Sequence, residues 1–271
     1  MPAPSEAGAA PIIEVRDLVA HYGTQQILHD ISLDVYPGEI MVIMGSSGSG
    51  KTTLLSHMLG LSRPTSGCIR LLGEDISQLN DRQLNDLRKQ IGVTFQGGAL
   101  FSSLTVAQNV QLPLREHTRL DENTIQIMTR MKLEVVNLAG FEHFMPSELS
   151  GGMVKRAAVA RAIAMDPKLL FFDEPSAGLD PVVSVGLDDL ILRLRRAMNI
   201  TIVVVTHELQ SAFKIADRIT MLDRGRVVIT GNVDEVRAAK DQHMQNLFNR
   251  MIEDVPVNAD DYLRRLTENI E

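Results

Sequence analysis

The sequence predicts an α/β fold in which a mainly parallel sheet is covered by helices on both faces. Wholly apolar runs at residues 40–44, 169–172 and 202–205 have the length of buried strands. Helical periodicities separate these runs along the chain, and this alternation is typical of parallel sheets. A glycine-rich segment joins the first of these strands to a helix, which indicates a loop at the carboxyl edge of the sheet.

Length, composition and charge describe a globular protein. The 271 residues can bury a sizeable core, with 44% apolar residues, 23% charged residues and a net charge of −7. The acidic balance argues against broad nucleic-acid binding. The single cysteine, Cys68, excludes an internal disulfide and a cysteine-rich zinc site, so a reducing compartment fits.

No segment has the pattern of a membrane span or a secretory signal. Apolar runs fall well short of the roughly 20 residues that cross a bilayer. Residues 1–11 are rich in proline and alanine and carry neither a basic charge nor an apolar core. We therefore expect a cytoplasmic protein with a short disordered lead-in at residues 1–11.

The first third of the chain predicts an antiparallel unit beside the parallel sheet. Residues 31–35 alternate between apolar and polar side chains, as in a half-exposed antiparallel strand. The expected order is a strand at 12–15, a strand at 31–35, a strand at 39–44, a helix at 52–61, a strand at 68–72, a helix at 81–89 and a strand at 91–95.

A helical subdomain is expected at about residues 97–160. Its apolar residues recur at helical spacing, first Val106, Val110 and Leu114 and later Ile127, Met131, Val135 and Leu138. After it, the expected order is a helix at 157–165, a strand at 169–172, a helix at 184–197, a strand at 201–205, a helix at 209–216 and a hairpin of 219–222 with 226–230 around Gly225.

The strongest local signal is a phosphate-binding loop. It reads Gly45, Ser46, Ser47, Gly48, Ser49, Gly50, Lys51 and Thr52, which matches G-x-x-x-x-G-K-[ST] between a strand and a helix. Backbone N–H groups and the helix N-terminus can then face phosphate oxygens. We expect Lys51 to reach the β- and γ-phosphates of ATP, Thr52 to ligate Mg²⁺ and Thr53 to extend the nucleotide-binding segment. The alternative is a plain Gly/Ser-rich loop.

An acidic pair closes the strand predicted at 169–172. Asp173 emerges at the carboxyl end, where open α/β sheets bind ligands, and is expected to hold Mg²⁺ through water. Glu174 is then placed to orient or deprotonate an attacking water molecule. Without the phosphate-binding loop, the same pair would be read as an ordinary surface turn.

Three further polar features follow predicted strands or precede a helix. Gln96 follows the strand at 91–95 and is expected on the metal or on water, and His207 follows the strand at 201–205 and is expected on the γ-phosphate. Ser150, Gly151 and Gly152 precede the helix at 157–165 and form a second anion-binding helix terminus. Taken alone, each would be read as a cap or a core residue.

In this order the motifs resemble those of an ABC-transporter ATPase subunit. The resemblance spans about residues 12–240 and rests on Tyr22, the loop at 45–52, Gln96, the segment at 149–153, residues 169–180 and His207. It implies a P-loop NTPase core of the RecA-like type, with an antiparallel β subdomain and an α-helical subdomain. Residues 241–271 would form a C-terminal extension.

The resemblance also implies a homodimer that holds two ATP molecules, each with Mg²⁺. Each ATP would lie between the loop at 45–52 of one chain and Ser150, Gly151 and Gly152 of the other. Tyr22 would stack on adenine, and Asp180 would couple the two sites. The family's segment usually ends in glutamine, whereas this chain has Met153.

A narrower resemblance bears on the substrate. Residues 95–118 and the segment around Met145 and Met153 are similar to the ATPases of the Mla phospholipid transport system, whose relatives power Mce-type lipid transport. This implies movement of phospholipids between membranes to maintain outer-membrane asymmetry. The implied partners are integral membrane permease subunits gripped near residues 97–118, a lipid-binding Mce-type protein and a small cytoplasmic accessory protein, with no nucleic acid. The chain would be peripheral on the inner membrane.

Alternatives remain for the transporter, for the class of protein and for the tail. An importer ATPase for a polar solute such as an amino acid shares every core motif and differs only near residues 97–118. A soluble ABC protein of translation or DNA repair, or a regulatory module without turnover, fits the sequence less well.

Two further features have a bland alternative. His117 is expected to be a surface residue more readily than a ligand. In the extension, Asp260 or Asp261 is expected to cap a short helix that either packs on its own chain or contacts another protein.

Overall fold

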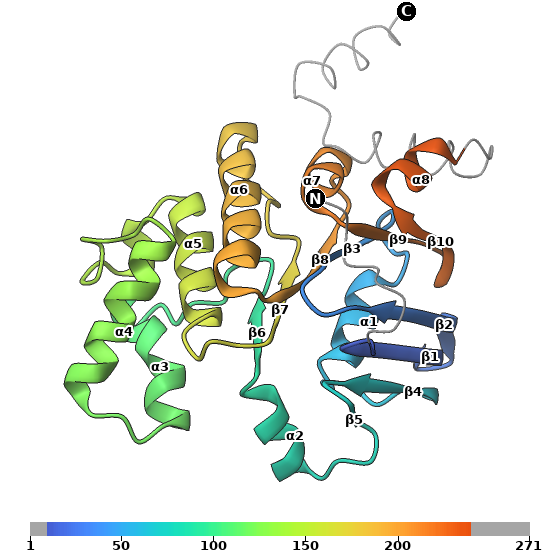
Figure 1. Ribbon diagram of the computed structural model, residues 1–271, viewed down its shortest axis with the longest axis horizontal. Coiled ribbons are helices and arrows are strands. Elements are labelled where there is room, and N and C mark those ends of the chain that lie inside the picture. Colours follow the sequence, from blue (N-terminus) through green and yellow to red (C-terminus); the bar gives the residue numbers. More distant parts are fainter. Residues whose placement is uncertain (1–9, 240–271) are drawn as a thin grey trace, which may run out of the picture.

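The computed structural model describes residues 10–239, which form two sheets and the helices around them (Figure 1). The expected C-terminal helix and most of the expected lead-in lie outside these residues. No helix within residues 10–239 is long and apolar enough to cross a membrane.

The central sheet has six strands in the order β10-β9-β3-β8-β7-β6. Strands β9, β3, β8, β7 and β6 run parallel, and β10 pairs antiparallel with β9 at one edge. Their bounds are β3 Ile40–Met44, β6 Ile91–Thr94, β7 Leu169–Asp173, β8 Thr201–Thr206, β9 Arg218–Asp223 and β10 Arg226–Asn232.

Alternate side chains of the central strands enter two different cores. In β3, Val42 packs on the side of the helical subdomain, whereas Ile43 packs on the side of the antiparallel sheet. In β7, Phe172 and Phe171 divide in the same way, and both are fully buried. Both faces of the sheet are therefore covered, which explains why these strands are apolar throughout instead of alternating.

A second sheet is antiparallel and has the order β2-β1-β4-β5. Its strands are β1 Ile13–Tyr22, β2 Gln25–Val35, β4 Ser66–Leu71 and β5 Glu74–Asp75. Strand β1 is longer than the predicted strand at 12–15 because a bulge interrupts its pattern. The register shifts between Val15 and Leu18, where Asp17 has a φ of 48°. After the bulge, Leu18 and Ala20 again face the core.

The helices at residues 106–162 pack on one another, and their buried side chains join the core on one face of the central sheet. Figure 1 shows α3, α4 and α5 at one end of the molecule and β1, β2 and β4 at the other, with β6, β7 and β8 between them. The helices are α1 Lys51–Met58, α2 Asp81–Arg88, α3 Val106–His117, α4 Glu122–Val135, α5 Gly151–Ala162, α6 Pro181–Met198, α7 Leu209–Ile215 and α8 Val233–Ala238, with a 3₁₀ turn at Pro146–Glu148.

Two helices begin before the segments that predict them, at residues 157–165 and 184–197. Helix α5 begins at Gly151, because Ser150 caps it as the sequence predicts and the two glycines, which are poor helix formers, are nevertheless helical. Helix α6 begins at Pro181 instead of residue 184, since Asp180 accepts the Val182 and Val183 N–H groups at 3.0 Å each. Proline at the first helical position suits this cap.

Helix α4 presents two apolar faces, of which the sequence analysis identified the exposed one. Ile125 and Leu133 are buried, together with Thr129. Ile127, Met131 and Val135, which recur at the same helical spacing, are exposed at 49%, 59% and 43%. The pattern predicted the helix correctly, but it could not assign which stripe packs against α3 and α5.

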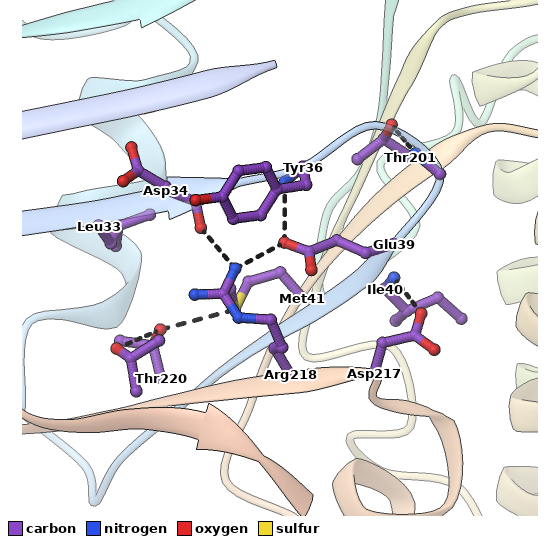
Figure 2. A network of polar contacts seen from close by, with 12 residues as sticks. Leu33, Asp34, Tyr36, Glu39, Ile40, Met41, Thr201, Asp217, Arg218 and Thr220 are labelled. Atoms are coloured by element: carbon purple, nitrogen blue, oxygen red, sulfur yellow. Dashed lines mark hydrogen bonds and ion pairs between the residues drawn. The ribbon is translucent and has the colours of Figure 1, made fainter. Parts of the chain in front are cut away.

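Arg218 of β9 is half-buried and pairs with the buried carboxylate of Glu39, and the same guanidinium links the central sheet to β2 (Figure 2). Arg218 Nη1 donates to Glu39 Oε1 and to the Asp34 carbonyl in β2, both at 3.1 Å, and the guanidinium lies 5.2 Å from the Tyr36 ring centroid. Burial raises the pKa of Glu39, while hydrogen bonds from the Tyr36 N–H and Arg218 oppose that rise. The carboxylate therefore depends on these donors.

A neighbouring pair ties α6 to the same edge. Asp217 Oδ2 accepts from the Ile40 N–H at 2.8 Å and from Arg195 Nη2 at 3.1 Å. Arg195 also donates to the Gly38 carbonyl at 2.9 Å, and the Gly38 N–H donates to the Thr201 hydroxyl at 2.9 Å. These bonds fix the starts of β3 and β8, so the amino edge of the sheet is held by charged groups.

We predict that Arg218→Met lowers the free energy of unfolding by roughly 3 kcal/mol, because Glu39 is left buried without its cation. Urea denaturation measures this loss. The matched control is Arg226→Met, at an exposed position of β10, where we expect a change within about 0.5 kcal/mol. If both substitutions lower the free energy of unfolding equally, the Glu39–Arg218 ion pair has no special role in stability.

Candidate functional site

Four neighbouring parallel strands end at the same edge of the central sheet, and polar residues follow each of them. The register pairs Met44 of β3 with Thr206 of β8, and Val205 of β8 with Asp173 of β7. The loop at residues 45–50 follows β3, and His207 follows β8, Glu174 follows β7, and Gln96 lies two residues beyond β6. The structure therefore brings these predicted site residues to one edge.

The glycine-rich loop leads directly into helix α1. Gly50 is the N-cap residue with a φ of 99°, and a methyl group there would lie 2.7 Å from the Leu28 side chain. Lys51 is buried, and its ammonium donates to the Gly45 carbonyl at 2.8 Å and to the Ser46 carbonyl at 3.0 Å. The cation is thus held inside the curve of the loop, beside the N-terminus of α1.

A cavity of about 320 Å³ lies beside this loop. It is lined by Tyr22, Gln25, Ile27, Gly48, Ser49, Gly50, Lys51, Thr52 and Thr53. Tyr22, at the end of β1, is 85% exposed, so its ring is free to stack on a planar ligand. A second cavity, of about 340 Å³ at the amino edge, is lined by none of the predicted site residues.

Asp173 has the surroundings of a cation ligand. It is 9% exposed, and its Oδ1 is buried without a hydrogen-bond partner among the described residues. Burial and then the neighbouring Glu174 carboxylate raise its pKa, against the effect of Lys51 and Lys155. A divalent cation nearby would compensate this buried oxygen. The buried carboxylate of Asp173 therefore fits a ligand of Mg²⁺, which commonly takes one or two carboxylates plus phosphate oxygens. The other two ligands expected from the sequence are Thr52, which lines the cavity, and Gln96, which follows β6.

Glu174 and His207 form a hydrogen-bonded pair that the sequence did not predict. His207 Nδ1 lies 2.9 Å from Glu174 Oε2, across the ends of β8 and β7. Glu174 has a φ of 46°, in the left-handed region, and its N–H donates to the Val205 carbonyl at 2.9 Å. The hydrogen bond that Glu174 accepts from the imidazole raises the pKa of His207 more than burial lowers it. The pair therefore favours an imidazolium facing the site.

Two cations of helix α5 hold the segment around Gln96. Lys155 donates to the Gln96 carbonyl and, at 3.4 Å, to the Glu174 carbonyl. Arg161 donates to the carbonyls of Gly98 and Ala99 at 3.0 Å and 2.7 Å. Burial lowers the pKa of both cations. Helix α5 and the ends of β6 and β7 are thus connected, which the sequence analysis missed. A lysine and an arginine within an alanine-rich helix were the available signal.

The predicted second anion site begins α5, away from the cavity. Ser150 is exposed and caps the helix through the Met153 N–H at 3.4 Å, and Gly151 is exposed beside it. A methyl group at Gly152 would lie 2.5 Å from the Val183 side chain. The lack of a side chain at Gly152 therefore allows α5 to pack closely on α6. Asp180 caps α6 in the same region.

Comparison with known proteins identifies the family. A family model described as ABC transporter matches residues 28–177, more than half of the chain. The chain is also 42% identical over 261 residues to an intermembrane phospholipid transport system ATP-binding protein, MlaF, of Haemophilus influenzae, covering 95% of this chain and 98% of that one. This chain belongs to the ABC transporter family.

Other relatives of this ABC protein carry two kinds of name. MlaF of Escherichia coli strain K12 is 41% identical and covers 93% of each chain. A protein of Mycobacterium leprae named probable ribonucleotide transport ATP-binding protein mkl is also 41% identical, over 81% of this chain and 63% of its own length. The resemblance to Mla ATPases that the sequence indicated is thereby confirmed.

Solved structures of ABC ATPases confirm the predicted fold class. The structure of cbiO1 from Clostridium perfringens, part of an ABC transporter complex, has a TM-score of 0.79 and 31% identity, covering 85% of this chain and 92% of that one. A dimeric ATP-binding cassette in a post-hydrolysis state, bound to ADP and Pi, has a TM-score of 0.75 and 30% identity, covering 82% of this chain and 98% of that one. The chain is an ABC ATPase with a P-loop NTPase core.

We predict that His207 titrates above the ordinary histidine value and that Glu174→Gln lowers its pKa, because the substitution removes the carboxylate. NMR titration of the imidazole measures both values. With a raised folded pKa, the pair stabilises the fold below the unfolded value of about 6.5, and this stabilisation is lost as pH rises through the folded pKa. Glu208→Gln, a minor contributor, is the control and should shift the pKa less. An unchanged pKa in Glu174→Gln would contradict the pair's role.

Proposed function

We propose that this chain is the ATP-binding and ATP-hydrolysing subunit of an ABC transporter that moves phospholipids between membranes, maintaining outer-membrane lipid asymmetry. The observation that carries the hydrolytic part is the Glu174–His207 pair, which lies at the same sheet edge as Asp173 and the phosphate-binding loop. The relatives named MlaF, similar along nearly their whole length, support the transport part.

The cavity and loop would divide the work of binding ATP. Tyr22 would stack on the adenine ring, and the loop from Gly45 to Thr53 would surround the phosphates. Lys51, which already has two oxygen acceptors 2.8 Å and 3.0 Å away in the loop, would exchange them for β- and γ-phosphate oxygens. Bound Mg²⁺, held by Thr52, Gln96 and Asp173, would supply charge neutralisation at the phosphates.

Hydrolysis would begin with water attacking the γ-phosphorus. Glu174 has one carboxylate oxygen on His207, so Oε1 remains to accept the proton of that water. An ionised carboxylate accepts only, so Nδ1 of His207 carries the hydrogen of this bond. The other ring nitrogen, Nε2, can then donate to the γ-phosphate when the imidazole is protonated. ADP and phosphate leave as products.

A dimer would complete the site. Ser150, Gly151 and Gly152 begin α5, whereas the phosphate-binding loop precedes α1, on another side of the chain in Figure 1. The similar ATP-binding cassette bound to ADP and Pi is dimeric. We therefore propose a head-to-tail homodimer in which these three residues contact the partner's ATP, Asp180 couples the sites, and C2 symmetry creates both together.

We predict that Glu174→Gln keeps ATP binding but lowers the turnover rate by at least about 100-fold, since a general base contributes that much or more. Phosphate release by the assembled transporter measures turnover, and calorimetry measures binding. The control is Glu208→Gln, at the residue directly after His207, and its turnover rate should stay within a few-fold of that of the unmodified chain. Comparable turnover in Glu174→Gln would exclude Glu174 as the base.

Membrane attachment would run through protein partners. Residues 97–118 are the proposed contact with the integral membrane permease subunits, and Phe101 within them is 51% exposed. A lipid-binding Mce-type protein and a small cytoplasmic accessory protein complete the proposed complex. The chain would then be peripheral on the inner membrane.

Purification of the intact complex from membranes tests the lipid assignment. We expect native mass spectrometry to find the permease, an Mce-type protein and bound phospholipid with this chain. A complex with a polar-solute-binding protein and no phospholipid would instead favour an importer, as the relative named for ribonucleotide transport would suggest. Glu174→Gln supplies a matched sample in which the complex should be captured with ATP bound.

A further inference from the structure

The turn between β9 and β10 contacts both sides of the nucleotide cavity. The Gly225 N–H donates to the Ser49 carbonyl of the phosphate-binding loop at 3.0 Å. The His29 N–H of β2 donates to the Gly225 carbonyl at 2.8 Å. One residue outside the predicted motifs therefore bridges the loop and the antiparallel sheet by backbone hydrogen bonds.

The approach of Gly225 to β2 leaves no room for a side chain. A methyl group at Gly225 would lie 1.9 Å from the Ile27 carbonyl oxygen and 2.9 Å from the His29 ring. On the other side, a methyl group at Gly50 would lie 3.7 Å from the Gly225 Cα. Ile27 and Gly50 both line the cavity.

Turn geometry alone does not account for this packing, because the chain contains a second turn of the same type. Arg224 and Gly225 have φ values of 46° and 72°, and Leu72 and Gly73, between β4 and β5, have values of 54° and 86°. Both are two-residue hairpin turns with left-handed residues, for which glycine is favoured. A methyl group at Gly73, however, would meet no described atom within 4 Å.

We infer that Gly225 is a positioning residue for nucleotide binding: its turn sets the spacing between the adenine side of the cavity, carried by β1 and β2, and the phosphate-binding loop. Tyr22 and Ile27 belong to the first side, and Ser49 and Gly50 to the second. A nucleotide that binds both sides requires this spacing, whereas a ligand that binds only the loop does not. The inference rests on the proposed function in one respect, that the ligand is an adenine nucleotide.

The test compares ADP with pyrophosphate, both with Mg²⁺, by calorimetry on the full chain. In Gly225→Ala we expect ADP to bind roughly tenfold more weakly, because the adenine and the phosphates can no longer both keep their contacts when the two sides of the cavity are displaced. Pyrophosphate affinity should change less than threefold. Gly73→Ala carries the same left-handed strain without the contact and should leave both affinities within about twofold of the parent chain.

A second variant tests the same inference if Gly225→Ala folds poorly. Insertion of one glycine between Arg224 and Gly225 adds no side chain but displaces the turn, so it should weaken ADP selectively as well. The same insertion beside Gly73 is its control. A parallel loss of ADP and pyrophosphate affinity, or no loss of either, would overturn the inference. If the unmodified chain binds neither ADP nor ATP, the proposed function itself fails.

Discussion

The parallel register of β3, β8, β7 and β6 is the constraint on which the site depends. Parallel strands end together, so the loop at residues 45–50, His207, Glu174 and Gln96 are neighbours although they lie far apart in the chain. The register is in turn held by apolar residues that fill a core on each face of the sheet. The positions of the polar residues at the carboxyl edge therefore depend on the packing of apolar side chains on both faces of the sheet.

Charged groups lie at both edges of that sheet, but the two edges differ in how far these groups are paired with one another. At the amino edge, Arg218 and Arg195 neutralise Glu39 and Asp217, and hydrogen bonds complete the network. At the carboxyl edge, Asp173 keeps a buried oxygen that has no partner among the described residues, and Glu174 is held in a left-handed conformation. The charges of the first edge are compensated within the chain, whereas the second edge keeps an unpartnered carboxylate oxygen and a strained backbone, both of which are typical of functional sites.

Most of the fold, and the gathering of the candidate site residues at one edge of the central sheet, could be predicted from the sequence, because their signals are local. The apolar strands, the loop at 45–52 and the Asp173–Glu174 strand end are each written in a few consecutive residues. Pairings between distant residues were not predictable. The bond of His207 to Glu174 and the contacts of Lys155 depend on how three strand ends and α5 meet.

Which face of α4 is buried depends on tertiary packing and not on its local sequence pattern. Two stripes on this helix are apolar, and only the tertiary packing decides that Leu133 faces inward and Met131 outward. Helix α5 extends upstream of the alanine-rich segment at 157–165 for a related reason, since Gly151 and Gly152 disfavour a helix locally but are held by the predicted Ser150 cap and by packing against α6. In both cases tertiary context outweighs local propensity.

The contact between Gly225 and Ile27 joins main-chain atoms on both sides. The carbonyl oxygen at position 27 is the same in every amino acid, so exchanging that side chain cannot make room for a larger residue at position 225. Relief would require the backbone itself to change length or path. Two side chains that touch in the surrounding core can be exchanged together for another pair that fits. The contact between Gly225 and the Ile27 carbonyl cannot change in this way. Among related chains, we therefore expect glycine to be kept at position 225 while side chains on the adenine side of the cavity change.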